Sequence, residues 1–363
     1  MEERDELKTF LSLKKEICNK RLFIWGTGNT ASLYQEGLKR LVKEKIVICG
    51  YVDNDCKKWG NNFFNKKILS PEELMQEKNV LVLITSPQPI VIRAVSKQLD
   101  DLGLEWIHID EYILKLHLKE VLEVYDLFED DYDRRLYSEL IHCRIEGRYP
   151  SEKYISNEQY FSFRDFVNSE SKDVFVDCGA YVGDTIEQYI WKTNGQFSKY
   201  IAFEPDSKNV DAMNYRVDRL KREWNIPDDK ILIYPYAIGE KNSVSYVERY
   251  SNNNGLGSKI VDSYDKDDAD EIKSVSIDEF LNEKVSFLKA DIESYEYKML
   301  LGAKKTIKKY NPKLAICIYH NVVDFYQIPL LIKKICPNYC ISIRHYTNRL
   351  SDTVLYAYVS END

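Results

Sequence analysis

The chain has 363 residues, of which 44% are hydrophobic, and its 51 basic and 59 acidic residues give a formal net charge of −8. This composition excludes a disordered chain, which lacks the apolar surface to offset the entropy of ordering, and the acidic balance argues against a nucleic-acid-binding protein. The apolar runs are far shorter than the roughly 20 residues of a membrane span. Because the eight cysteines include no C-x-x-C pair, we expect no disulfide framework, no metal site and a cytoplasmic location.

The first part of the chain, about residues 20–113, alternates strand-like and helix-like patterns. The strand-like stretches lie at residues 21–29, 45–55, 79–87 and 105–113, and the helix-like stretch ASLYQEGLKRLVKE lies at residues 31–44. Such alternation indicates right-handed βαβ units around a parallel sheet. We therefore predict a Rossmann-like α/β domain over residues 1–113.

A glycine-rich turn follows the first of these strands. Gly26, Gly28 and Ala31 match the pattern G-x-G-x-x-G/A, and Asp53 ends the next strand in the position of an acidic ribose partner. Three interpretations remain open for this domain. In the first, the domain is a module that handles a nucleotide-sugar or another substrate. In the second, it is an NAD(P)-dependent sugar oxidoreductase or epimerase. In the third, it is a scaffold through which the protein forms a homo-oligomer.

Residues 114–158 show a different pattern, in which apolar residues recur at helical spacing among many charged ones. We predict that this segment is a helical linker between two domains and that its helices end at Gly147 and Pro150.

A second and longer α/β series begins at about residue 172. We predict seven strands, at residues 173–179, 199–205, 231–239, 285–292, 313–320, 340–346 and 353–359. The last two are joined by a link too short for a parallel crossover, so they should form an antiparallel hairpin. The polar stretch at residues 251–271 reads as an exposed loop, in which Asn254 to Lys259 could close over a substrate.

The strongest motif is VFVDCGAYVGDTI at residues 174–186, in which an apolar strand ends at Asp177 and Gly179 and Gly183 lead into a helix. Glycines let a backbone approach a ligand closely, and the N–H groups of a helix N-terminus face the same ligand. Glu204 ends the next strand, where a carboxylate can accept hydrogen bonds from a ribose.

The turn reads D-x-G-x-x-x-G, and a carboxylate before the first glycine suits a cationic amine better than a pyrophosphate. We therefore predict S-adenosylmethionine as the cofactor, with Asp177 at its amine and Glu204 at its ribose. The predicted cofactor-binding residues are Asp177, Gly179, Ala180, Tyr181, Gly183, Asp184, Thr185, Glu204, Pro205, Asp206, Ala237 and Ile238.

Several ordered segments resemble the FkbM family of S-adenosylmethionine-dependent methyltransferases. They include VFVDCGAYVGDT, IAFEPD, YAIGEKNSVSYV, SVSIDEFL and LKADIESYEYKMLLGAKKTIKKYNPKLAICIYH, and the resemblance covers about residues 159–359. It implies a class I methyltransferase fold over residues 159–363, with seven strands of which the last is antiparallel. It also implies methylation of a hydroxyl group on a sugar, glycan or nucleotide-sugar.

One position departs from the family pattern. The family's D-[VI]-E-G-x-E reads D-I-E-S-Y-E here, so Ser294 stands in the place of a glycine and the pose of Glu293 is open. This departure is the one hint that the whole protein could instead be a non-catalytic binding protein on a methyltransferase scaffold.

Three residues at strand ends are candidates for catalysis, because a sugar hydroxyl attacks a methyl group readily only after a base takes its proton. Asp291 and Glu293 end the fourth strand of the second series, and His320 ends the fifth. We predict that His320 or Asp291 is the base and that Glu293 orients it or binds substrate. The structural alternatives are a helix cap for the two acids and an ordinary hydrogen-bonded histidine.

Overall fold

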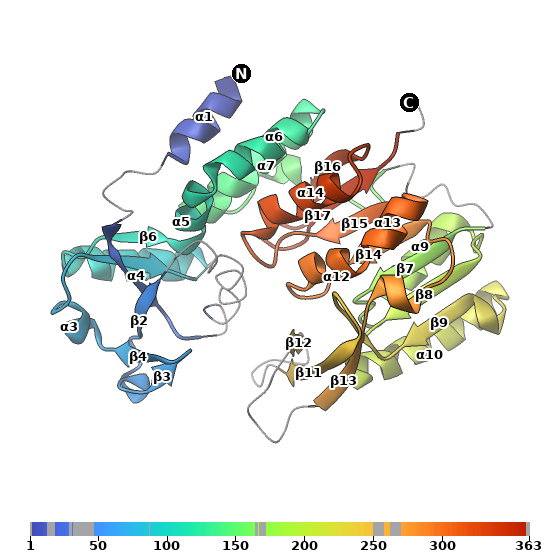
Figure 1. Ribbon diagram of the computed structural model, residues 1–363, viewed down its shortest axis with the longest axis horizontal. Coiled ribbons are helices and arrows are strands. Elements are labelled where there is room, and N and C mark those ends of the chain that lie inside the picture. Colours follow the sequence, from blue (N-terminus) through green and yellow to red (C-terminus); the bar gives the residue numbers. More distant parts are fainter. Residues whose placement is uncertain are drawn as a thin grey trace. The chain divides into compact units, whose positions relative to one another are not determined.

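In the computed structural model, the described residues are 2–12, 19–28, 31, 47–86, 88–163, 166, 172–249, 258–261 and 270–360 (Figure 1). The chain divides into two compact units. The first consists mainly of Met1–Ile155 and includes two short later segments, and the second consists of Ser156–Ile318, Gln327–Tyr346 and Asp352–Asp363.

The first unit contains a six-stranded sheet in the order β3-β4-β2-β1-β5-β6. Its strands are β1 (Arg21–Trp25), β2 (Ile48–Val52), β3 (Asn62–Phe63), β4 (Lys66–Leu69), β5 (Val80–Ile84) and β6 (Trp106–His108). All neighbours are parallel except β3 and β4. The predicted strands at residues 21–29, 45–55 and 79–87 are therefore confirmed, whereas the stretch at 105–113 is strand only at Trp106–His108 and becomes helix from Ile109. The predicted helix at residues 31–44 lies, apart from Ala31, outside the described residues.

The β3–β4 hairpin was not predicted. Its two turn residues, Phe64 and Asn65, have φ of 45° and 61°. Such left-handed turns are usually signalled by Asn-Gly or Asp-Gly, and Phe-Asn gives no such signal.

The remaining elements among the described residues of the first unit are helical. They are α1 (Glu2–Phe10), η3 (Cys56–Lys58), α3 (Pro71–Leu74), α4 (Pro89–Asp101), α5 (Ile109–Leu116), α6 (Leu118–Leu127), α7 (Asp131–Glu146) and η4 (Glu152–Tyr154). Helix α7 ends as predicted at Gly147, which caps it with a left-handed φ of 62°.

The second unit contains a seven-stranded sheet in the order β16-β17-β15-β14-β7-β8-β9. Its strands are β7 (Val174–Cys178), β8 (Lys199–Phe203), β9 (Ile231–Tyr234), β14 (Phe287–Ala290), β15 (Lys313–Cys317), β16 (Cys340–His345) and β17 (Thr353–Tyr358). The predicted antiparallel hairpin is confirmed, because β17 runs antiparallel to both β15 and β16. The sheet thus has the class I methyltransferase form, and its order reverses between β7 and β14.

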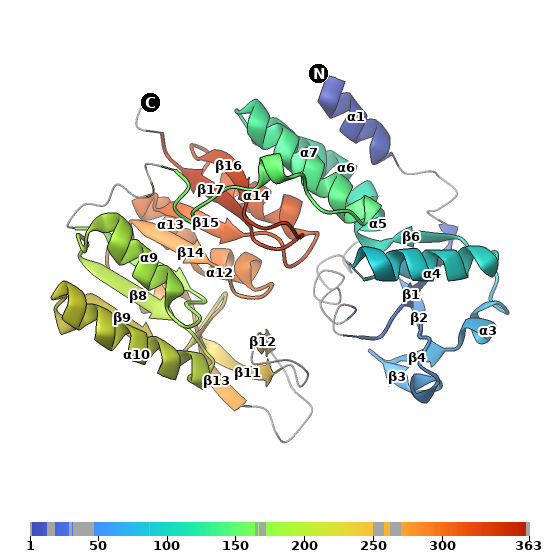
Figure 2. The ribbon, with the colours of Figure 1, turned by 180° about the vertical axis from the view of Figure 1, so that it is seen from behind.

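Helices cover both faces of this sheet, with α9 and α10 on one face and α12 and α13 on the other (Figures 1 and 2). The helices of the unit are α9 (Asp184–Thr193), α10 (Ser207–Trp224), η5 (Asp228–Lys230), α11 (Ile277–Phe280), α12 (Glu296–Gly302), α13 (Lys304–Tyr310) and α14 (Asp324–Ile335). None of the described helices has the length and apolar character of a membrane span.

A four-stranded sheet with the order β10-β13-β11-β12 corrects two predictions. Its strands are β10 (Ala237–Ile238), β11 (Ser243–Arg249), β12 (Ser258–Val261) and β13 (Asp270–Val275). The predicted single strand at 231–239 is divided between two sheets, and part of the predicted loop at 251–271 is strand, while residues 251–257 and 262–269 lie outside the described residues. The strands were missed because Ser, Lys and Asp, which are common in them, have little β propensity.

Candidate functional site

The glycine turn after β7 is fixed by contacts within the protein. Gly179 and Gly183 both have φ of +80°. A Cβ on Gly179 would lie 1.9 Å from the carbonyl oxygen of Asp291, and one on Gly183 would lie 3.0 Å from Cγ of Met213. Both glycines therefore have a left-handed φ, and Gly179 is also packed closely against backbone, reasons that differ from the predicted approach of a ligand.

Asp177 lies under this turn and is completely buried. The Nζ of Lys289 lies 2.8 Å from its Oδ1, and the hydroxyl of Tyr200 donates a 2.6 Å hydrogen bond to its Oδ2. The carboxylate that was expected to face a ligand amine is thus engaged by two side chains of the protein. The sequence predicted the strand at residues 285–292 that contains Lys289, but it gave no role to the lysine itself.

Glu204 joins the turn after β7 to the loop after β8. Its Oε2 accepts from the backbone N–H of Tyr181 at 3.0 Å, and its Oε1 accepts from the N–H of Asp206 at 3.0 Å and from Nδ2 of Asn209 at 3.2 Å. Burial raises the pKa of Glu204, and these hydrogen bonds oppose the shift. Since a carboxylate offers about four acceptor positions, three protein donors leave room for one ligand hydroxyl.

The other predicted cofactor residues lie around the same carboxyl edge. Asp206 caps α10 by accepting from the N–H of Lys208, and Asp184 is the first residue of α9. The remaining small or apolar positions are Ala180 and Thr185, which are buried, Pro205, which is half-buried, and Ala237 and Ile238, which form β10. The glycine turn and the ends of β7 and β8 thus lie at the same edge of the sheet. Asp206 has a structural role as well, because it caps α10.

The turn after β14 carries the predicted acids Asp291 and Glu293. Glu293 and Ser294 have φ of 51° and 77°, so the serine adopts the left-handed conformation that glycine would favour. The replacement therefore leaves the glycine-type turn in place.

Tyr160 contacts Asp291 and was missed by the sequence analysis. Its hydroxyl donates a 2.9 Å hydrogen bond to Oδ2 of Asp291, and its own φ is 68°. Tyr160 lies near the start of the segment that resembles the family, but it belongs to none of the motifs that carry the resemblance, and it precedes the first strand of the domain by more than ten residues.

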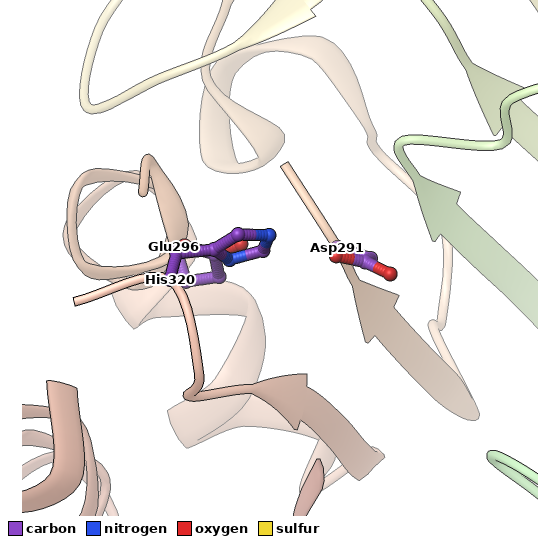
Figure 3. Close-up of side chains that lie close together, drawn as sticks. All are labelled: Asp291, Glu296 and His320. Carbon is purple, nitrogen blue, oxygen red and sulfur yellow. The ribbon is translucent and has the colours of Figure 1, made fainter. Parts of the chain in front are cut away.

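Figure 3 shows Asp291 and His320 with a third residue, Glu296. Each offers one potential ligand atom, and these atoms lie within 4.8 Å of one another. Glu296 is buried and accepts a 2.8 Å hydrogen bond from the N–H of Ile292, so it also holds the turn. Two of the three predicted catalytic residues are brought together here, and Glu296, rather than Glu293, completes the group.

A cavity of about 330 Å³ lies beside the turn after β14. Its polar lining residues are Glu240, Lys241, Ser243, Ser274, Tyr295 and Lys298. Two lysines against one glutamate give this lining a positive balance, which suits an anionic group.

Comparisons with known proteins agree with the fold. A family model described as the methyltransferase FkbM domain matches residues 177–343, and one described as the C2185-like N-terminal domain matches residues 18–109. A search of curated proteins found no match. The structure of methyltransferase FkbM from Methylobacillus flagellatus KT is 19% identical with a TM-score of 0.55, covering 98% of this chain and 97% of that one.

Two more solved structures match about half of the chain. A putative rRNA methylase from Clostridium thermocellum is 10% identical with a TM-score of 0.35, covering 53% of this chain and 90% of that one. Fibrillarin from Aeropyrum pernix, solved with bound S-adenosylmethionine, is 10% identical with a TM-score of 0.32, covering 53% and 67%.

Proposed function

Because residues 177–343 form a methyltransferase domain of the FkbM family, we propose that this enzyme transfers a methyl group from S-adenosylmethionine to a hydroxyl of a sugar, glycan or nucleotide-sugar. The observation that carries the proposal is the family match over the segment that contains the glycine turn, Glu204 and Asp291. The sparse cysteines support the further proposal that the enzyme works in the cytoplasm.

We assign the cofactor to the carboxyl edge of the sheet, beside the turn after β7 and the loop after β8. Glu204 supports this assignment, since its remaining acceptor position suits a ribose hydroxyl, and the N–H groups at the start of α9 suit a carboxylate. Ala237 and Ile238 offer apolar surface for an adenine. In this assignment Asp177 does not contact the cofactor; it supports the glycine turn through Lys289, which bonds to the carbonyl oxygen of Gly179.

The chemistry asked of the chain is modest. S-adenosylmethionine supplies a methyl group on a sulfonium, so the chain must hold the acceptor oxygen in line and remove its proton. We assign proton removal to Asp291, with His320 as the alternative base and Glu293 as a substrate contact. A general base contributes about 10²–10⁴-fold to such a reaction.

The positively charged cavity supports an acceptor that carries a phosphate or another anionic group. Among the proposed acceptors, this favours a nucleotide-sugar over a neutral glycan. We propose separately that the first unit is a module that handles a nucleotide-sugar or another substrate.

The contacts of Asp53 weigh against the dinucleotide interpretation of the first unit. Its carboxylate accepts from the N–H and hydroxyl of Thr27, from the N–H of Asp55 and from Nζ of Lys58. Four protein donors use the acceptor positions that a ribose diol would need. We therefore do not assign an oxidoreductase or epimerase reaction to this unit.

A ligand-binding measurement tests the proposal. A ligand that binds the native state at a hundred times its Kd stabilises it by about 2.7 kcal/mol, or about 5 to 10 °C in melting temperature for a domain of this size. S-adenosylhomocysteine should produce this shift in the wild type and in Glu223→Gln, an exposed control on α10, and the shift should be lost in Glu204→Gln. No shift in the wild type at millimolar ligand contradicts the proposal.

A transfer assay tests the acceptor. With methyl-labelled S-adenosylmethionine, label should appear in one member of a panel of nucleotide-sugars and methyl glycosides. Label in a neutral glycoside alone contradicts the assignment of an anionic acceptor.

A further inference from the structure

A buried lysine links the two loops that meet at the reversal of strand order. Lys289 lies on β14 directly opposite Asp177 on β7 and is 3% exposed. Few lysines are buried so completely without a partner, and this one has its partner in Asp177 at 2.8 Å.

Lys289 also holds the backbone of the glycine turn. Its Nζ donates a 2.7 Å hydrogen bond to the carbonyl oxygen of Gly179, in addition to its contact with Asp177. Burial of the ammonium group lowers the pKa of Lys289, but attraction to Asp177 and Asp291 and the hydrogen bond to Asp177 together raise it above its ordinary value. The lysine is therefore a charged donor, and charge-assisted hydrogen bonds are the stronger ones.

A third contact leads from Lys289 toward the candidate base. Its Nζ lies 5.1 Å from the centre of the Tyr160 ring, in the range of a cation–π interaction. The hydroxyl of that ring donates to Asp291, and the N–H of Tyr160 donates a 2.9 Å hydrogen bond to the hydroxyl of Tyr356. Tyr160 thus bridges the lysine and the carboxylate, and its left-handed φ is a strained conformation of the kind found at functional sites.

We propose that Lys289 is a positioning residue of the methyl-transfer site, fixing the carbonyl of Gly179 on one side and, through Tyr160, the carboxylate of Asp291 on the other. One ammonium group thereby sets the cofactor turn and the base relative to each other. Tyr160 lies outside the segment that matches the family model, so this part of the site belongs to the flanking chain. The inference rests on the proposed use of S-adenosylmethionine.

The test separates positioning from simple stabilisation. Lys289→Met leaves Asp177 buried without its cationic partner, with only the hydrogen bond from Tyr200. The variant should therefore melt well below the wild type and bind S-adenosylhomocysteine at least tenfold more weakly by calorimetry. Removing both charges in Lys289→Met/Asp177→Asn should restore most of the melting temperature, because neutral replacement of a buried ion pair is often close to neutral for stability. Affinity should stay at least tenfold reduced, since the donor to the Gly179 carbonyl is still missing.

The controls use the same chemistry at the opposite end of the sheet. Lys199 is the first residue of β8, and its Nζ pairs with Glu283. Lys199→Met should leave the affinity for S-adenosylhomocysteine unchanged. If the double variant regains both melting temperature and wild-type affinity, Lys289 is structural and the inference is overturned. If the wild type itself binds no S-adenosylhomocysteine, the proposed function fails first, and the two failures are thereby distinguished.

The Tyr160 arm has its own readout. Tyr160→Phe keeps the ring over Lys289 but removes the donor to Asp291, so affinity for S-adenosylhomocysteine should stay within twofold while kcat for the labelled acceptor falls at least tenfold. Tyr339→Phe removes an equally buried hydroxyl, which donates to the carbonyl of Pro312, and should change neither quantity. An unchanged kcat in Tyr160→Phe overturns this half of the inference.

Discussion

Replacing Gly179 with alanine should destabilise the second unit strongly, for two separable reasons. A left-handed backbone costs an L-residue about 1–2 kcal/mol relative to glycine. The new Cβ would also lie 1.9 Å from the carbonyl oxygen of Asp291, a separation that the backbone must increase by more than 1 Å. Such overpacking costs about 1–3 kcal/mol, so we expect a total loss of about 2–5 kcal/mol.

Gly195→Ala is the matched control for this variant. Gly195 has φ of +69°, but a Cβ there would meet nothing nearer than 3.8 Å, the distance to the ring of Trp224. This variant should therefore lose only the backbone part, about 1–2 kcal/mol. Urea unfolding followed by circular dichroism measures both, and the reasoning is refuted if Gly179→Ala is no less stable than Gly195→Ala.

Three further predictions concern single side chains. Ser294→Gly should raise the unfolding free energy by about 1 kcal/mol, since it relieves a left-handed φ of 77°, and a lower melting temperature than the wild type would show that the serine is not strained. Burial raises the pKa of Glu204 in the folded protein above its ordinary 4.5. Between the pKa of Glu204 in the unfolded chain and its higher pKa in the folded protein, the folded protein holds more of the proton, so the free energy of unfolding decreases as pH rises through this range. The stability of Glu204→Gln relative to the wild type should therefore increase across that pH range, and a flat difference in melting temperature against pH would contradict the shift. Asp53→Ala should destabilise the first unit by about 0.5–1.5 kcal/mol, because the partly exposed donors on Thr27 and Lys58 lose their acceptor but can bond to water instead. The affinity for S-adenosylhomocysteine by calorimetry should stay unchanged, and a weakened affinity would show that the first unit takes part in binding the cofactor.

The strands of the second unit could be predicted because they are buried and apolar. Residues 174–178 and 313–317 read as short apolar runs, and the structure makes them neighbours of the central strand β14. The short link between the last two strands settled their antiparallel direction, since geometry excludes a parallel crossover of that length. Three strands of the small sheet escaped prediction because they are polar, and its first strand was read as the end of a longer strand, β9.

The partners of the site residues could not be predicted in the same way. Sequence placed Asp177 and Asp291 at strand ends but gave no indication of which side chains would reach them. Lys289 reads as one polar residue in an apolar strand, and it faces Asp177 because the two strands pair in a register fixed by the whole sheet. Tyr160 reaches Asp291 from 131 residues away in the sequence, so the chain between them carries no local signal of the contact.

A crystal structure of the full chain with S-adenosylhomocysteine would show where the cofactor binds. We expect density for the ligand beside the backbone of Gly179–Gly183, with its ribose in hydrogen-bonding distance of Glu204. Density at the Gly26 turn of the first unit, or a ribose distant from Glu204, would contradict it.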